Sequence, residues 1–174
     1  FPLPTTEDDA AQFRNLTKLA SQARRNGQEV VVVMGLGFVG AVMAAIIADT
    51  VDRRGKPSKF VIGCQRPSHR SYWKIPLINR GTSPIKGEDP EVGVLIARTV
   101  KDKKTLVATH NRDCLKLADC VVVDVQCDYL KRELGNMRNG EADMAALEDT
   151  MHVIGERIPS ECLVLIETTV APGT

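Results

Sequence analysis

Residues 30–40 read VVVVMGLGFVG, an apolar run that leads into three closely spaced glycines. Residues 30–34 show no polar alternation, which is typical of a strand covered on both faces in a parallel sheet. Residues 41–48, AVMAAIIA, follow directly and predict a buried helix. A G-x-G-x-x-G turn between a buried strand and a buried helix is the setting in which this motif binds a dinucleotide. The sequence therefore predicts a dinucleotide site here, with a turn that only packs as the alternative.

Each glycine has its own expected task in such a site. Gly35 permits the tight turn, Gly37 lets the backbone approach a pyrophosphate, and Gly40 lets the helix pack closely on the strand. The amides at the start of the helix, around Phe38 and Val39, attract phosphate because they are unpaired and carry partial positive charge. The whole turn is therefore predicted to contact the cofactor: Gly35, Leu36, Gly37, Phe38, Val39 and Gly40.

Short apolar segments and helical patterns alternate along the rest of the chain. Further strands are expected at residues 60–64, 105–109, 120–125 and 162–166, with helices at 68–79, 89–99, 113–117 and 144–158. An earlier amphipathic helix is expected to begin with a capping box of Thr6 and Asp9 and to end at Asn26. Five strands joined by helices predict an α/β fold, a Rossmann-type doubly wound parallel sheet with an extra N-terminal helix.

We expect two parts in this chain. Residues 1–28 form an N-terminal extension that covers the sheet or a partner surface, and residues 29–174 form the dinucleotide-binding domain. Residues 126–140 are polar and predict an exposed connection.

Composition and charge narrow the classes of function. The 174 residues carry 23 Lys and Arg against 22 Asp and Glu, a net charge of +1, which offers no surface for nucleic acid. No apolar run approaches the roughly 20 residues that cross a bilayer, so no membrane association is expected. The five cysteines are odd in number and lack a C-x-x-C pair, so reduced thiols and a cytoplasmic location are expected. The histidines are too scattered for a metal site and are expected to be exposed or loosely packed: His69, His110 and His152.

The residue that ends the second predicted strand bears on the choice of cofactor. An acidic side chain at this position accepts hydrogen bonds from the adenosine ribose in NAD-binding proteins, but this chain has Gln65. A neutral amide next to Arg66 does not repel a 2′-phosphate. We expect NAD as the cofactor, and the neutral Gln65 makes NADP the alternative.

Four passages carry a wider resemblance. They are residues 35–40, residues 77–85 (LINRGTSPI), residues 118–123 (ADCVVV) and residues 166–174 (IETTVAPGT). Together they resemble the amino-terminal NAD-binding domain of the UDP-glucose/GDP-mannose dehydrogenase family, over about residues 29–174. The resemblance implies an enzyme of polysaccharide biosynthesis that oxidises the C6 hydroxymethyl group of a UDP- or GDP-sugar to a uronic acid, in two hydride transfers to NAD.

The resemblance also assigns roles to single residues. Gln65 takes the ribose-reading position, and Arg70 matches a basic side chain near the adenosine end. Thr168 and Thr169 match a pair that approaches the nicotinamide, and the second of them, Thr169, lies near the catalytic site. The segment Val125, Gln126 and Cys127 stands where the family has a V-x-T-P sequence against the cofactor; the place of its proline is taken by Asp128, which brings a negative charge.

The remaining functional parts of such an enzyme are expected outside this sequence. In the family, the nucleophilic cysteine and the sugar-nucleotide-binding domain come later in the chain, and Cys127 has no activating neighbour in sequence. We therefore expect these residues to bind the dinucleotide without completing catalysis, the nucleotide sugar to bind through the later part, and the full-length protein to be a homodimer. The alternatives are a non-catalytic dinucleotide-binding regulatory module and another Rossmann dehydrogenase, of the 6-phosphogluconate or hydroxyacid type.

Overall fold

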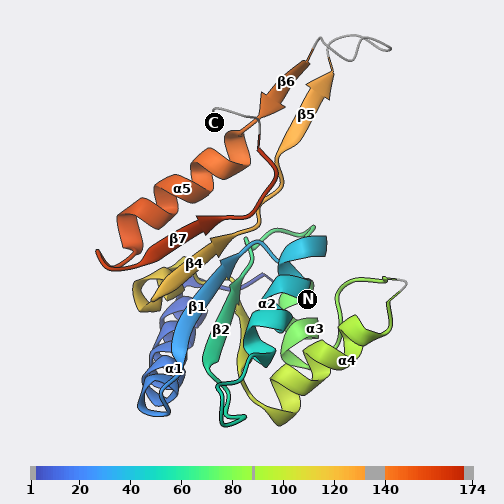
Figure 1. Ribbon diagram of the computed structural model, residues 1–174. Helices are drawn as coiled ribbons and strands as arrows, with labels where there is room; N and C mark the ends of the chain where they lie inside the picture. Colours follow the sequence, from blue (N-terminus) through green and yellow to red (C-terminus); the bar gives the residue numbers. More distant parts are fainter. Residues whose placement is uncertain (1–2, 88, 132–139, 171–174) are drawn as a thin grey trace.

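A five-stranded parallel sheet forms the centre of the computed structural model, which describes residues 3–87, 89–131 and 140–170 (Figure 1). The strands are β1 (Glu29–Met34), β2 (Lys59–Cys64), β3 (Leu106–Thr109), β4 (Cys120–Val123) and β7 (Leu163–Ile166), in the order β3-β2-β1-β4-β7. The strand order reverses at β1, which pairs with β2 on one side and β4 on the other. Ligands of open parallel sheets bind at this kind of switch point, outside the carboxyl ends of the strands.

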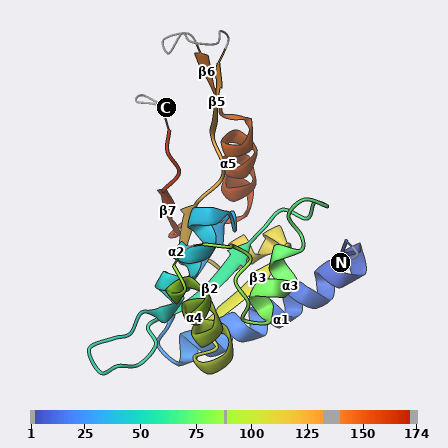
Figure 2. The same cartoon turned by 90° about the vertical axis from the view of Figure 1, so that its right-hand side faces the viewer.

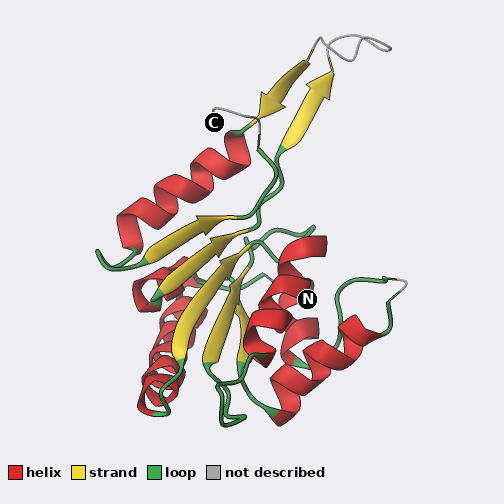
Figure 3. Cartoon of the chain, viewed as in Figure 1, coloured by secondary structure: helices red, strands yellow, loops and turns green. Residues whose placement is uncertain are grey.

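Helices cover both faces of the sheet (Figures 2 and 3). They are α1 (Thr6–Arg25), α2 (Phe38–Asp49), α3 (Lys74–Asn79), α4 (Glu91–Ala97), the π-helical turn η1 (Arg98–Asp102), the 3-10 helix η2 (Arg112–Leu117) and α5 (Ala145–Arg157). Val30 and Val32 of β1 face a core with α1, η2 and α5, whereas Val31 and Val33 face a core with α2, α3 and α4. The uninterrupted apolar run of β1 is explained by this burial on both faces. The predicted Rossmann-type fold is confirmed.

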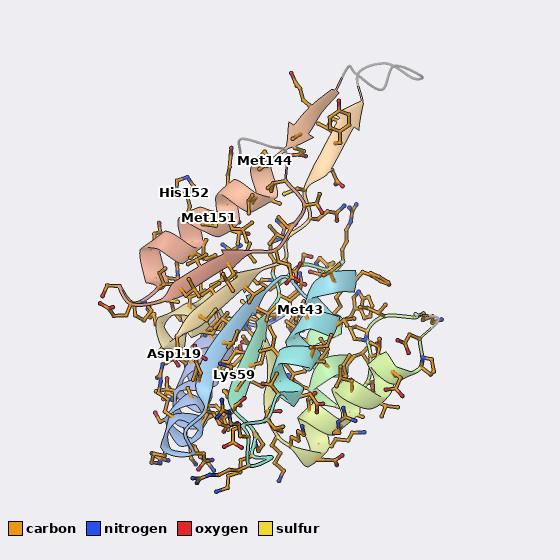
Figure 4. The ribbon with its side chains drawn as sticks, viewed as in Figure 1. Met43, Lys59, Asp119, Met144, Met151 and His152 are labelled. Atoms are coloured by element: carbon orange, nitrogen blue, oxygen red, sulfur yellow. The ribbon has the colours of Figure 1, made fainter. Side chains whose placement is uncertain are left out.

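The N-terminal helix α1 is an integral part of one core. Its residues Leu16, Ala20 and Ala23 are buried against the sheet. Arg24 near its end pairs with Asp119 at 2.8 Å, and the Asp119 carboxylate also accepts the Val30 amide at 2.7 Å, at the amino end of the sheet (Figure 4). The extension thus covers the sheet, as expected.

The start of α1 differs from the prediction by one residue. Thr5 is the N-cap, and it forms the capping box with Asp8. The sequence TTEDD offers two registers for the same motif, Thr5 with Asp8 and Thr6 with Asp9, and local pattern alone does not separate them. The extended backbone of Thr5, with φ −102° and ψ 170°, places the cap there.

The helix expected at residues 144–158 is present as α5, and one of its faces is packed against the core. Leu147 and Ile154 are buried, and Met144 and Met151 pack beside them (Figure 4). At the edge strand β7, Leu163 is 57% exposed and Leu165 is 47% exposed, because no described helix covers this end of the α2 face.

The predicted exposed connection at residues 126–140 is partly wrong. Its ends pair as an antiparallel hairpin of β5 (Asp128–Lys131) and β6 (Gly140–Asp143), which projects from the domain (Figure 1). Gly140 makes room for the ring of Tyr129, because a Cβ on that glycine would overlap it. Residues 132–139 lie outside the described residues. No helix of the described residues is long and apolar enough to cross a membrane.

Candidate dinucleotide site

Two of the three turn glycines are required by the chain itself. Gly35 has a φ of 96°, and a Cβ there would overlap the carbonyl oxygen of Asp124 at the end of β4. A Cβ on Gly40 would overlap the carbonyl oxygen of Gly35. Gly37 is different, since its Cβ would meet no atom within 4 Å. Open space therefore lies over Gly37, at the point where the motif brings the backbone close to a pyrophosphate.

The first turn of α2 leaves its amides available. Gly37 is the N-cap and provides no side-chain cap, and the first turn holds no acidic residue. Phe38 is 72% exposed and Val39 is 53% exposed, so the helix begins at the surface. Unpaired amides and the helix dipole together make this terminus suitable for a phosphate group.

Gln65 is bound to the glycine turn. Its side-chain oxygen accepts a hydrogen bond from the backbone amide of Leu36 at 2.8 Å, and its backbone amide donates to the carbonyl of Thr109 at 2.9 Å. The Leu36 side chain is buried and fills the space beside Gly63, where a Cβ would come within 2.7 Å of it. The predicted ribose-reading residue thus lies next to the turn, and its side-chain oxygen already accepts one hydrogen bond from it.

The segments that follow β4 and β7 are tied together. The hydroxyl of Thr168 donates to the carbonyl of Val125, and the amide of Thr168 donates to the carbonyl of Val123 at 3.2 Å. Gln126 donates to both carboxylate oxygens of Asp128, at 2.8 and 2.9 Å, so these two side chains bind each other. Cys127 is half-buried and packs against the core on the α1 face. Thr168 therefore holds the predicted nicotinamide-side segment, whereas Thr169 is exposed.

A carboxyl pair that sequence reasoning missed lies beside the turn. Asp124 follows β4, Glu167 follows β7, and the two carboxyls lie close enough to interact. Burial, and next the charge of Glu167, raise the pKa of Asp124 to about 6. Its Oδ2 is buried and has no hydrogen-bond partner among the described residues. The two acids are neighbours because β4 and β7 pair in parallel and end at the same edge of the sheet. The sequence alone does not show that these two strands pair.

The basic residues of the predicted site lie further from the turn. Arg66 and Arg70 are both exposed, and the carbonyl of Arg70 accepts the indole N–H of Trp73 at 2.8 Å. Arg66 lines a cavity of about 820 Å³ that extends away from the turn, toward α1 and the segment after β3. The structure thus brings Gly35, Leu36, Gln65, Val125 and Thr168 together, whereas Arg70 and Thr169 are exposed.

His110 lines the same cavity and corrects the prediction for the histidines. It is 5% exposed, its Nε2 lies 2.7 Å from an Asp9 carboxylate oxygen, and its ring packs edge-on against Tyr72. The partner in α1 is 101 residues away in sequence, so no local pattern signals this burial. His69 and His152 are exposed, as expected.

No group of three or more His, Cys, Asp or Glu side chains that could hold a metal is found in the described part of the chain. All five cysteines are free thiols, and Cys64, Cys114 and Cys120 are buried.

Comparisons with known proteins agree with this geometry. A solved NDP-N-acetyl-D-galactosaminuronic acid dehydrogenase from Methanosarcina mazei Go1 is 32% identical, with a TM-score of 0.71, over 91% of this chain and 31% of that chain. A GDP-mannose dehydrogenase from Pseudomonas aeruginosa is 28% identical, with a TM-score of 0.64, over 83% of this chain and 29% of that chain. A UDP-D-ManNAc dehydrogenase from Pyrococcus horikoshii is 25% identical, with a TM-score of 0.62, over 83% of this chain and 29% of that chain.

The chain thus spans less than a third of the length of these relatives. The comparison with curated proteins finds no match. A family model described as the NAD-binding domain of the UDP-glucose/GDP-mannose dehydrogenase family matches residues 29–174. With the parallel sheet, the glycine turn and the open N-terminus of α2, this match shows that the chain belongs to the UDP-glucose/GDP-mannose dehydrogenase family.

Proposed function

We propose that residues 29–174 bind the cofactor of a nucleotide-sugar 6-dehydrogenase, which oxidises the C6 hydroxymethyl group of a UDP- or GDP-sugar to a uronic acid. The observation that carries the proposal is the open space over Gly37, between two glycines that the chain needs for its own packing. A nicotinamide dinucleotide supplies the hydride acceptor of this reaction. The sugar and its nucleotide are proposed to bind to the later part of the parent protein, a cytoplasmic homodimer in which residues 1–28 remain an extension.

Different residues of the site bind different parts of the cofactor. The amides of Gly37, Phe38 and Val39 bind the pyrophosphate, with Gly35, Leu36 and Gly40 shaping the turn. Gln65, Arg66 and Arg70 serve the adenosine end. Val125, Gln126, Cys127 and Thr168 border the nicotinamide end, and Thr169 is the residue of this chain that reaches the reacting groups. NAD is the cofactor that the family description names, and the neutral Gln65 also leaves room for NADP.

Calorimetric titration of this chain with NAD tests the proposal. Gly37→Val should weaken binding about tenfold or more, because the added side chain occupies the space of the pyrophosphate. Gly155→Val in α5 is the matched control, since a Cβ at Gly155 also meets no atom within 4 Å and lies away from the turn. Equal NAD affinity of the Gly37 variant and the unchanged chain would contradict the site.

A further inference from the structure

The side-chain amide of Gln65 is oriented as a donor. Its oxygen already accepts one hydrogen bond, from the Leu36 amide, whereas both of its N–H groups are free to meet a ligand. A carboxylate at this position accepts a hydrogen bond from the 2′-hydroxyl of NAD. At neutral pH a phosphate on the same ribose oxygen is mostly dianionic, so its free oxygens accept hydrogen bonds. Gln65 therefore offers the hydrogen-bonding character that a 2′-phosphate needs.

The cavity of about 820 Å³ begins at the residue that follows Gln65. Arg66 and Pro67 line it from the end of β2, residues 110–113 from the end of β3, and Arg14 with its neighbours from α1. This volume lies in the range of small-ligand sites and exceeds what a phosphate group requires. The ribose 2′ position expected at Gln65 thus adjoins a space that can take an added group.

In the part of the chain that the structure describes, two arginines of this cavity have no carboxylate partner. The lining acids are both engaged: Asp9 with His110 at 2.7 Å, and Asp113 with Lys116 at 3.1 Å. The remaining lining arginines are paired as well, Arg112 with Asp149 and Arg157 with Glu156. Among the described residues, Arg14 and Arg66 form no ion pair. They are two uncompensated cations on different walls of one cavity.

The wall that α1 contributes is fixed in place. The Asn111 side chain donates to the carbonyl of Asp9 at 2.7 Å, and the Asp9 carboxylate contacts the buried His110. Gln12, one turn further along, hydrogen-bonds to the Thr109 hydroxyl at the end of β3. These contacts hold the helix that carries Arg14 against the same strand end that flanks Gln65. The backbone that carries Arg14 is therefore held at this cavity by the fold.

We propose that this cavity binds the 2′-phosphate of NADP, through Arg14, Arg66 and the amide of Gln65, so that the chain binds NADP more tightly than NAD. The inference rests on the proposed dinucleotide site and adds to it the choice of cofactor. Guanidinium groups bind phosphate oxygens through charge-assisted, frequently bidentate hydrogen bonds. NAD lacks this group and leaves both arginines solvated.

Separate titrations of this chain with NADP and with NAD test the inference. The unchanged chain should bind NADP about fivefold to tenfold more tightly than NAD, since one charge-assisted contact is worth about this factor or more. Arg66→Gln and Arg14→Gln should each weaken NADP binding by about threefold to tenfold and change NAD binding by less than about twofold. Arg25→Gln is the matched control, an exposed arginine at the other end of α1, and it should change neither affinity.

The outcomes separate this inference from the proposed function. NAD binding equal to or tighter than NADP binding overturns the inference and leaves the dinucleotide site standing. An NADP preference that survives in both arginine variants also overturns it, because the phosphate would then lie elsewhere. Failure of the unchanged chain to bind either dinucleotide overturns both. Thermal unfolding of each variant, matched to the unchanged chain, ensures that a lost affinity reports the lost contact.

Discussion

The side-chain oxygen of Gln65 accepts a hydrogen bond from the backbone amide of Leu36, with 2.8 Å between the two atoms. This bond joins the end of β2 to the glycine turn that follows β1. It occupies one lone pair of the Gln65 oxygen and leaves both side-chain N–H groups free, so the residue that we propose to lie at the ribose presents donors there. The hydrogen bond thus links the geometry of the turn to the choice of cofactor.

Replacing Gln65 by glutamate tests that link. Gln65→Glu keeps an acceptor for Leu36 and introduces a negative charge at the ribose position. The charge should weaken NADP binding by about tenfold or more, through repulsion of the 2′-phosphate, and should leave NAD binding equal or stronger. The measurement is the ratio of the two dissociation constants. An unchanged ratio would show that the 2′ position of the ribose lies away from residue 65.

A methyl group on Gly40 should destabilise the fold. In Gly40→Ala the new Cβ overlaps the carbonyl oxygen of Gly35, and backbone atoms cannot move aside as a flexible side chain can. We expect the free energy of unfolding to fall by about 2–4 kcal/mol in urea titrations. Gly93→Ala in α4 is the control; its Cβ meets no atom within 4 Å, and it should raise stability by up to about 1 kcal/mol. Equal stability of the two variants would contradict the tight turn.

The raised pKa of Asp124 predicts a pH dependence of stability with a definite sign. Its pKa is about 6 in the folded chain against a reference of 3.8. Between these values the folded state retains a proton that the unfolded state has lost, so stability falls as the pH rises. Asp124→Asn removes this loss. Its gain in melting temperature should be present above pH about 6 and should shrink toward zero as the pH falls to about 4.

Glu161→Gln is the control for Asp124, because it removes one exposed carboxylate in the turn before β7. Its effect on the melting temperature should be small at both ends of the pH range. A gain for Asp124→Asn that is the same at all pH values would mean that Asp124 is ionised throughout.

The contribution of α1 to the core can be measured through Leu16. This side chain is 1% exposed, so Leu16→Ala should lower the free energy of unfolding by about 2–5 kcal/mol. Lys18→Ala, an exposed position on the same helix, should change it by less than about 0.5 kcal/mol. Urea unfolding followed by circular dichroism measures both. A small loss for Leu16→Ala would indicate that α1 unfolds independently of the sheet.

Some features were predictable because they depend on neighbours in the sequence. The apolar runs of β1 and β4, the helical spacing of α5 and the glycine turn are each local patterns, and the structure has all of them. The hairpin of β5 and β6 was missed because its two strands are short and largely polar. Neither strand shows the continuous apolar run that marks the strands of the main sheet. The one-residue error at Thr5 arose because two overlapping capping boxes satisfy the same local rule.

The sequence alone determined the Rossmann-type fold and the position of the glycine turn, since both depend on apolar and glycine patterns of successive residues. Only the folded chain determined the chemistry around that turn. The bond between Gln65 and Leu36, the carboxyl pair of Asp124 and Glu167, and the burial of His110 by α1 all join residues from 29 to 101 positions apart. Strand pairing and helix docking bring such distant residues together. Each contact then depends on how the side chains are oriented, which the spacing of residues along the sequence does not show.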